Sequence, residues 1–142
     1  MRLENKIAVI TGAGSGIGRA CSLLMGEEGA KIVASDVVTE RVEETARLVQ
    51  EKGGSCITVT ADISNTDDVS RMIHAAVETF GRLDILVNNA GILLMKSLLE
   101  TTEEEWDRVQ TINLKSVFLC CKRAIPEMLN AGKGNIVNIA SL

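Results

Sequence analysis

The stretch TGAGSGIG at residues 11–18 places glycine at every second position, between a short apolar run and a helical pattern. Glycine loses more backbone freedom on folding than any other residue, so four at one junction indicate a turn with special requirements. The apolar run from Lys6 to Thr11 predicts a strand. Apolar residues at helical spacing follow the glycines: Ile17, Ala20, Cys21 and Leu24. A strand, a glycine turn and a helix in this order are typical of an α/β fold.

The alternation of strand-like and helix-like segments continues along the chain. The predicted strands are Lys6–Thr11, Lys31–Asp36, Cys56–Ala61, Leu83–Gly91, which runs into a loop, and Gly134–Ser141. Helical stripes lie between them, and we expect Pro126 to kink or end the last helix, which starts at a capping box at Thr102. Because the strands are continuously apolar, both faces of the sheet should be covered. The prediction is a Rossmann-type doubly wound parallel sheet of five strands and four helices, with strand order 3-2-1-4-5, forming a single domain over residues 1–142.

Composition excludes several classes of protein. Fifteen Lys and Arg against nineteen Asp and Glu give a net charge of −4, which is unlike a nucleic-acid-binding surface. The apolar runs are too short to span a bilayer, and charges near the N-terminus argue against a secretory signal. The four cysteines lack zinc-site spacing, and the one histidine, His74, is expected on the surface. We therefore expect a cytoplasmic protein with no metal, nucleic acid or membrane partner.

The glycine turn lies where a doubly wound sheet binds ligands, between the first strand and the first helix. A helix N-terminus offers unpaired N–H groups and a partial positive charge, and residues without Cβ let an anion approach. We expect Gly12 to form the tight turn, Gly16 to allow close approach of a pyrophosphate, and Gly18 to pack the helix on the strand. The predicted cofactor contacts here are Thr11, Gly12, Gly14, Ser15, Gly16, Ile17 and Gly18, with N–H donors at Ser15 and Ile17.

Asp36 ends the second predicted strand, near the distance from the glycines at which dinucleotide-binding folds place an acidic residue on the ribose. A carboxylate there would repel a 2′-phosphate, and Val37 and Val38 follow it where an arginine would be needed. Arg19 is the one cation near these motifs, and we expect it on the first helix turn. The sequence therefore favours NAD over NADP as cofactor.

The spacing of the glycines is TGxxxGxG and does not fit the common GxGxxG pattern. This motif resembles the short-chain dehydrogenase/reductase family, and three more segments support the resemblance in the same order along the chain. They are NNAG at residues 88–91, NLKSVF at 113–118 and GNIVNIAS at 134–141. The resemblance implies an oxidoreductase that transfers hydride between a nicotinamide and an alcohol or ketone.

The resemblance also assigns roles beyond the glycine turn. It places Asp62 and Ile63 beside the adenine, although Asp62 is equally readable as a turn residue ahead of Ser64 and Asn65. It places Asn88, Ala90 and Gly91 along the cofactor groove, and Asn88 has a structural alternative, tying the fourth strand to its neighbours. In the family, the helix containing Val117 to Cys121 joins a subunit interface, which implies a homodimer or homotetramer.

Family members act through an Asn, Ser, Tyr and Lys tetrad. Asn113 matches its asparagine and Ser141 its serine, but the chain has no tyrosine, and the family's YxxxK pair would lie beyond Leu142. Two hypotheses follow: the cofactor-binding part of a dehydrogenase, incomplete relative to the family, or a non-catalytic dinucleotide-binding or assembly module. We expect weak NAD binding, negligible turnover by this chain alone, and an exposed apolar edge along the fifth strand.

Overall fold

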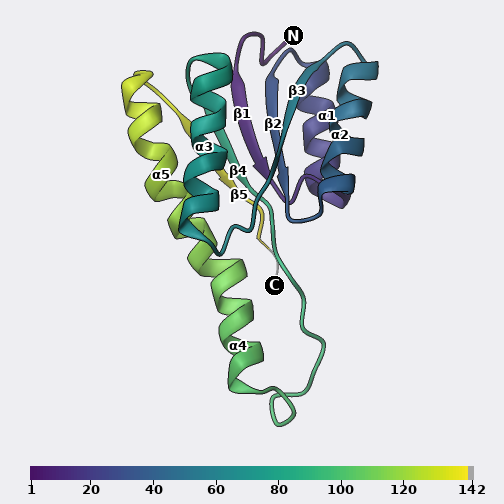
Figure 1. The fold of residues 1–142 in the computed structure, drawn as a ribbon, viewed down its shortest axis with the longest axis vertical. Helices are drawn as coiled ribbons and strands as arrows, with labels where there is room; N and C mark the ends of the chain where they lie inside the picture. The colour runs from purple at the N-terminus through teal and green to yellow at the C-terminus, as the bar shows by residue number, and fades with distance from the viewer. Residues whose placement is uncertain (141–142) are drawn as a thin grey trace.

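The computed structural model describes residues 1–140, and its five strands form one parallel sheet in the order β3-β2-β1-β4-β5 (Figure 1). The strands are β1 (Ile7–Thr11), β2 (Lys31–Asp36), β3 (Ser55–Thr60), β4 (Ile85–Asn88) and β5 (Asn135–Asn138). All four strand pairings are parallel. The predicted fold class and strand order are therefore confirmed, while β4 and β5 are shorter than the sequence pattern indicated.

Four helical regions connect the strands, as predicted. They are α1 (Gly16–Glu27), α2 (Thr39–Glu51), α3 (Thr66–Phe80) and a long last region. The last region consists of α4 (Glu103–Gln110), a π-helical segment η1 (Thr111–Lys115) and α5 (Ser116–Asn130). Pro126 lies inside α5, which runs on to Asn130, so this proline does not end the helix. Figure 1 shows α1 and α2 on one face of the sheet, α3 and α5 on the other, and α4 extending beyond the sheet.

The alternation of side chains along the strands divides the core into two layers. In β1, Ile7 and Val9 face the layer that contains α3 and α5, while Ala8 and Ile10 face the layer that contains α1 and α2. Burial of one isoleucine or valine side chain contributes about 1.5–3 kcal/mol to folding. Cys120 lies in the first layer, where burial raises the pKa of its thiol to about 12, so it acts as a small apolar residue, as expected.

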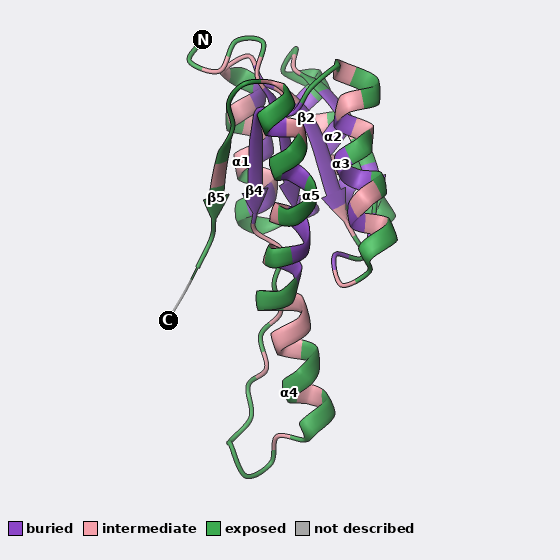
Figure 2. Ribbon diagram, turned by 90° about the vertical axis from the view of Figure 1, so that its left-hand side faces the viewer, coloured by how far each residue is buried: buried purple, intermediate pink, exposed green. Residues whose placement is uncertain are grey.

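The strand β5 forms an exposed edge of the sheet, as the sequence predicted. Among the described residues β5 pairs with β4 alone, and three of its four residues are exposed (Figure 2). Val137 is 45% exposed, in contrast to β1 and β4, in which every residue is buried. Unpaired N–H and C=O groups on such an edge can accept another strand.

The surface of α3 carries the one histidine. His74 is exposed, as predicted, with Nε2 3.0 Å from the Glu78 carboxylate one turn along the helix. Within residues 1–140, no cluster of three His, Cys, Asp or Glu side chains is arranged to hold a metal ion. In the same part of the chain, every helix is too short or too polar to cross a membrane.

Candidate cofactor cleft

The glycine turn is anchored by the hydroxyl of Thr11 at the end of β1. Thr11 Oγ1 accepts hydrogen bonds from Asn89 N at 3.0 Å and Ala90 N at 3.1 Å, just beyond β4. The Asn89 side chain returns the contact, since its Nδ2 donates to the carbonyls of Thr11 and Gly12. The two loops that leave β1 and β4 are thereby tied together at the carboxyl edge of the sheet.

Three glycines of the turn have distinct structural roles. Gly12 has a φ of +62°, and a Cβ there would lie 2.8 Å from Ala90 Cα, so this position requires both the left-handed conformation and the absence of a side chain. A Cβ on Gly18 would lie 2.2 Å from the Gly12 carbonyl oxygen. Gly18 therefore packs α1 against the turn itself, rather than against a strand as we predicted. Gly16 has a φ of +51° and open space where its Cβ would stand.

The N-terminus of α1 is open to an anion. Ser15, the residue at its N-cap, is extended and makes no side-chain hydrogen bond to the first turn. The first turn also carries no acidic residue. No side chain of the cap or first turn therefore neutralises the N–H groups and partial positive charge of this helix end, and the open space at Gly16 leaves room for a phosphate group.

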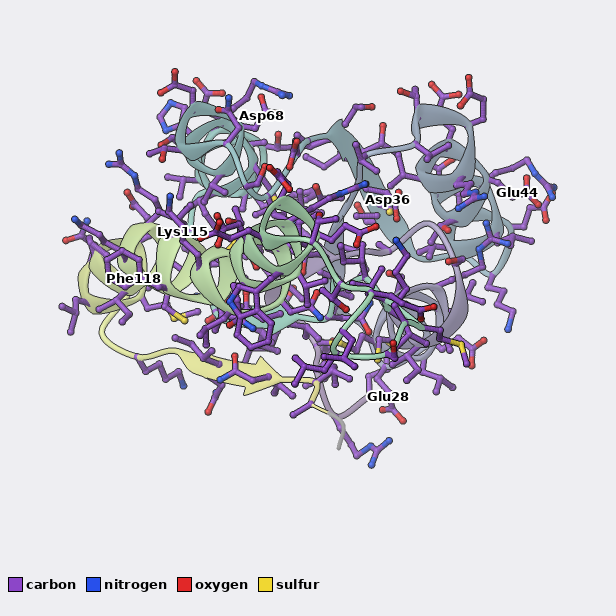
Figure 3. All side chains as sticks on the ribbon, turned by 90° about the horizontal axis from the view of Figure 1, so that it is seen from below. Glu28, Asp36, Glu44, Asp68, Lys115 and Phe118 are labelled. Carbon is purple, nitrogen blue, oxygen red and sulfur yellow. The ribbon has the colours of Figure 1, made fainter. Side chains whose placement is uncertain are left out.

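Asp36 lies across the turn from α1, at the end of β2. Its Oδ2 accepts a hydrogen bond from Gly14 N at 2.9 Å, and its Oδ1 accepts one from Val38 N at 3.0 Å. Figure 3, which is turned by 90° from Figure 1 and views the molecule from below, shows Asp36 between Glu44, on α2, and Asp68, on α3. Two backbone amides thus fix the carboxylate, and it retains lone pairs for further donors.

These groups border a cleft of about 750 Å³, a volume usual for a cofactor site. Its walls come from the glycine turn, the ends of β2 and β3, the loop after β4, and the last turn of α4 with η1. The predicted residues that line it are Gly12, Ser15, Gly16, Ile17, Asp36, Asp62, Ile63, Ala90 and Gly91. Nine residues chosen from separate motifs therefore meet in one concave site.

Other predicted residues lie beside the cleft rather than along it. Thr11, Gly14 and Gly18 support its walls through the contacts described above. Asn88 is buried, and its Nδ2 donates to Asn138 Oδ1 at 2.9 Å, which is the structural alternative for this residue: it ties β4 to β5. Ser141 lies outside the described residues.

Asn113 lies in the π-helical segment between α4 and α5. Its side-chain amide makes two hydrogen bonds to the backbone of Ile92, in the loop after β4. Oδ1 accepts from Ile92 N, and Nδ2 donates to Ile92 O, each at 2.8 Å. Single π-helical turns within α-helices are frequent at functional sites. Asn113 therefore positions the loop that forms one wall of the cleft.

Asp62 has the hydrogen bonds of a turn residue and also lines the cleft. Its Oδ1 accepts from both the N–H and the hydroxyl of Ser64, and the next helix is capped by Asn65, whose side chain accepts from the amides of Asp67 and Asp68. Asp62 and Ile63 both border the cleft. The turn role is thus visible in the structure, while contact with adenine stays a proposal.

Sequence reasoning missed Asn89, Arg41 and Ser35. Asn89 lies inside the NNAG motif, and the signal that points to it is an amide side chain just after a strand, which is suited to bonding turn carbonyls. The expectation that Arg19 is the one nearby cation is wrong, because Arg41 also lines the cleft. Arg19 is on the first turn of α1, as predicted, and donates to Gly14 O and Thr45 Oγ1.

Ser35 precedes Asp36 in β2 and supports the view that the cleft accepts a ligand. Its side chain is buried, yet within residues 1–140 its Oγ has no hydrogen-bond partner, and Ser35 borders the cleft. A buried hydroxyl without a partner costs about 1–3 kcal/mol. With the open space at Gly16 and the uncapped amides of α1, the lining of this cleft fits a dinucleotide.

Comparison with known proteins agrees with this geometry. The family profile described as short chain dehydrogenase matches residues 6–142. An uncharacterized oxidoreductase of Thermotoga maritima is 41% identical over 141 residues, which cover 99% of this chain and 55% of that protein. The 3-oxoacyl-[acyl-carrier-protein] reductase FabG of the same organism is 37% identical over 142 residues, covering 100% of this chain and 58% of that one.

A solved structure shares the fold closely. The 7α-hydroxysteroid dehydrogenase complexed with NADH and 7-oxo glycochenodeoxycholic acid superposes with a TM-score of 0.95 at 33% identity, covering 99% of this chain and 55% of that one. The chain thus spans little more than half the length of the relatives it matches.

Proposed function

The chain belongs to the short-chain dehydrogenase family, and on that premise we propose that its cleft binds a nicotinamide dinucleotide, NAD in preference to NADP, as the dinucleotide-binding domain of an oxidoreductase acting on an alcohol or ketone. The observation that carries the proposal is the pairing of the open N-terminus of α1 with the fixed carboxylate of Asp36. A pyrophosphate suits the first and ribose hydroxyls suit the second. Asp62, Ile63, Ala90 and Gly91 complete the walls around the adenosine half.

When bound, the nicotinamide would supply or accept the hydride. The chain's own contribution is to bind and orient the cofactor through the glycine turn and Asp36. Asn113 would act as a positioning residue, because both polar ends of its side chain hold Ile92. By family resemblance, Ser141 would contact the substrate oxygen.

The proposal predicts that a methyl group on Gly16 blocks the cofactor. Gly16→Ala should weaken NADH binding at least tenfold, because its Cβ would occupy the space before the α1 amides. Gly81→Ala is a matched control: Gly81 also has a positive φ, +89°, and open space, but it ends α3 outside the cleft. Each substitution should cost stability by about 1 kcal/mol through backbone strain.

Titration of NADH fluorescence against folded protein measures the result. The expected outcome is saturable binding by the wild-type chain and Gly81→Ala, with loss in Gly16→Ala. Folded wild-type protein that gives no saturable signal, or equal affinity in both variants, would contradict the proposal. Circular dichroism of each sample shows that it is folded.

The second candidate function is a dinucleotide-binding module without catalysis. The 142 residues contain no tyrosine, whereas in the family a tyrosine whose pKa is lowered by a neighbouring lysine is the acid–base group. Both candidates bind NADH, and they differ in turnover. NADH oxidation with a ketone by this purified chain would count against the non-catalytic candidate.

We also propose that the chain forms a homodimer or homotetramer in the cytoplasm. Large apolar side chains on the last helical region stand exposed, among them Leu114 at 65% and Phe118 at 59% (Figure 3 labels Phe118). A groove between them is lined mostly by residues of η1 and α5. Sedimentation velocity tests this proposal, and a monomer at all concentrations would contradict it.

A further inference from the structure

A cation stands beside the carboxylate at the ribose end of the cleft. Arg41 is the third residue of α2 and lines the cleft together with Asp36. A Cβ built on Gly14 would lie 2.8 Å from Arg41 Cβ and 2.7 Å from Asp36 Oδ2, so both side chains flank the same glycine. A cationic and an anionic side chain therefore start from the two sides of Gly14 and both line the cleft.

The guanidinium of Arg41 is uncommitted within residues 1–140. Its backbone carbonyl accepts hydrogen bonds from Arg19 and Thr45, but its side chain has no ion pair or hydrogen bond with another described residue. Arg47, on the same helix, is by contrast bound to Glu44 and Glu51. Because Arg41 is exposed and at the rim of the cleft, its five N–H donors are available to a ligand.

The charge of Arg41 opposes the effect of Asp36 on a phosphate at the ribose. Asp36 is held in place by two backbone amides, so it cannot turn away from an approaching anion without losing these hydrogen bonds. The guanidinium of Arg41 lines the same cleft and attracts the anion that Asp36 repels, and guanidinium–phosphate contacts are among the stronger hydrogen bonds. The net preference at the 2′ position is then set by the pair and not by Asp36 alone.

We infer that Arg41 is a specificity-determining residue that contacts the 2′ substituent of the adenosine ribose and lessens the discrimination of Asp36 against a 2′-phosphate. NADP then enters the cleft with an affinity below that of NAD. The inference rests on the proposed function, since it requires the adenosine half of the cofactor to lie at Asp36.

The test uses ADP-ribose and 2′-phospho-ADP-ribose, which carry the adenosine half without the reactive ring. Arg41→Met keeps the Cβ beside Gly14 and removes the charge. It should weaken binding of the 2′-phosphorylated probe about tenfold, while binding of ADP-ribose changes less than about twofold. Arg47→Met makes the same change of charge on the same helix outside the cleft and should leave the ratio of the two affinities unaltered.

Isothermal titration calorimetry on the folded chain gives both affinities for each variant. The effect of Arg41→Met should shrink as salt rises from 0.05 to 0.5 M, because exposed charges are then screened. If ADP-ribose binds and Arg41→Met leaves the ratio unchanged, or if Arg47→Met moves it equally, the inference is wrong and the proposed function stands. If folded wild-type protein binds neither probe, the proposed function fails, and the inference fails with it.

Discussion

Thr11→Val should lower the free energy of unfolding by about 2–4 kcal/mol, because it leaves two backbone amides without an acceptor. Thr11 is 2% exposed, and its hydroxyl accepts from Asn89 N and Ala90 N, so water cannot replace it without opening the loop. Valine has nearly the same shape, and the loss therefore measures the hydrogen bonds and not the packing. The same variant should bind NADH poorly, since the loop after β4 forms one wall of the cleft.

Urea unfolding followed by far-ultraviolet circular dichroism measures this effect. Thr11→Ser is the matched control, because it keeps the hydroxyl and removes one methyl group, at a cost of about 1 kcal/mol. If the valine variant proves as stable as the serine variant, the hydroxyl does not anchor the two loops.

Gly18→Ala should destabilise the fold by about 3 kcal/mol, at the upper end of the usual cost of overpacking. The new Cβ would lie 2.2 Å from the Gly12 carbonyl oxygen and 2.6 Å from Asn89 Nδ2. The first of these is a backbone atom that cannot rotate aside, so α1 and the glycine turn must separate. The amides of α1 then lose their alignment, and NADH affinity should fall with the stability.

A control for the second prediction exists at the other wall of the cleft. A Cβ on Gly91 would lie 3.4 Å from Asn113 Oδ1, which is an ordinary van der Waals contact. The free energy of unfolding of Gly91→Ala should therefore lie within about 1 kcal/mol of the wild-type value. Differential scanning calorimetry compares the two variants. Equal melting temperatures would show that the contact at Gly18 is not restrictive.

The sheet and its helices were predictable because burial leaves a periodic pattern in the sequence. The strands β1 and β4 are apolar up to their last residue, and Val69, Met72, Ile73 and Ala76 form a buried stripe at helical spacing in α3. The ends of elements were less predictable: β5 stops at Asn138 although the apolar pattern continues through Ile139. Pairing with β4, which itself ends at Asn88, sets that limit.

The candidate site was predictable where a residue type has one strong use, as with glycine before a helix or an aspartate at a strand end. It was not predictable where the role depends on which loops meet. Asn89 bonds carbonyls 77 and 78 residues away, and Arg41 reaches the cleft because α2 starts as early as Thr39. No local sequence pattern indicates either contact, since both depend on the packing of β1 between β2 and β4.

The π-helical segment η1 (Thr111–Lys115) affects how the sequences of homologues align with this chain. Such a turn holds one residue more than an ordinary helix turn, and each residue advances a helix by about 100°. Deleting one residue there would leave an unbroken helix, yet it would rotate everything before it, Trp106 included, by that angle relative to α5. An alignment gap at this place would therefore mark a homologue in which α4 turns a different face toward the cleft.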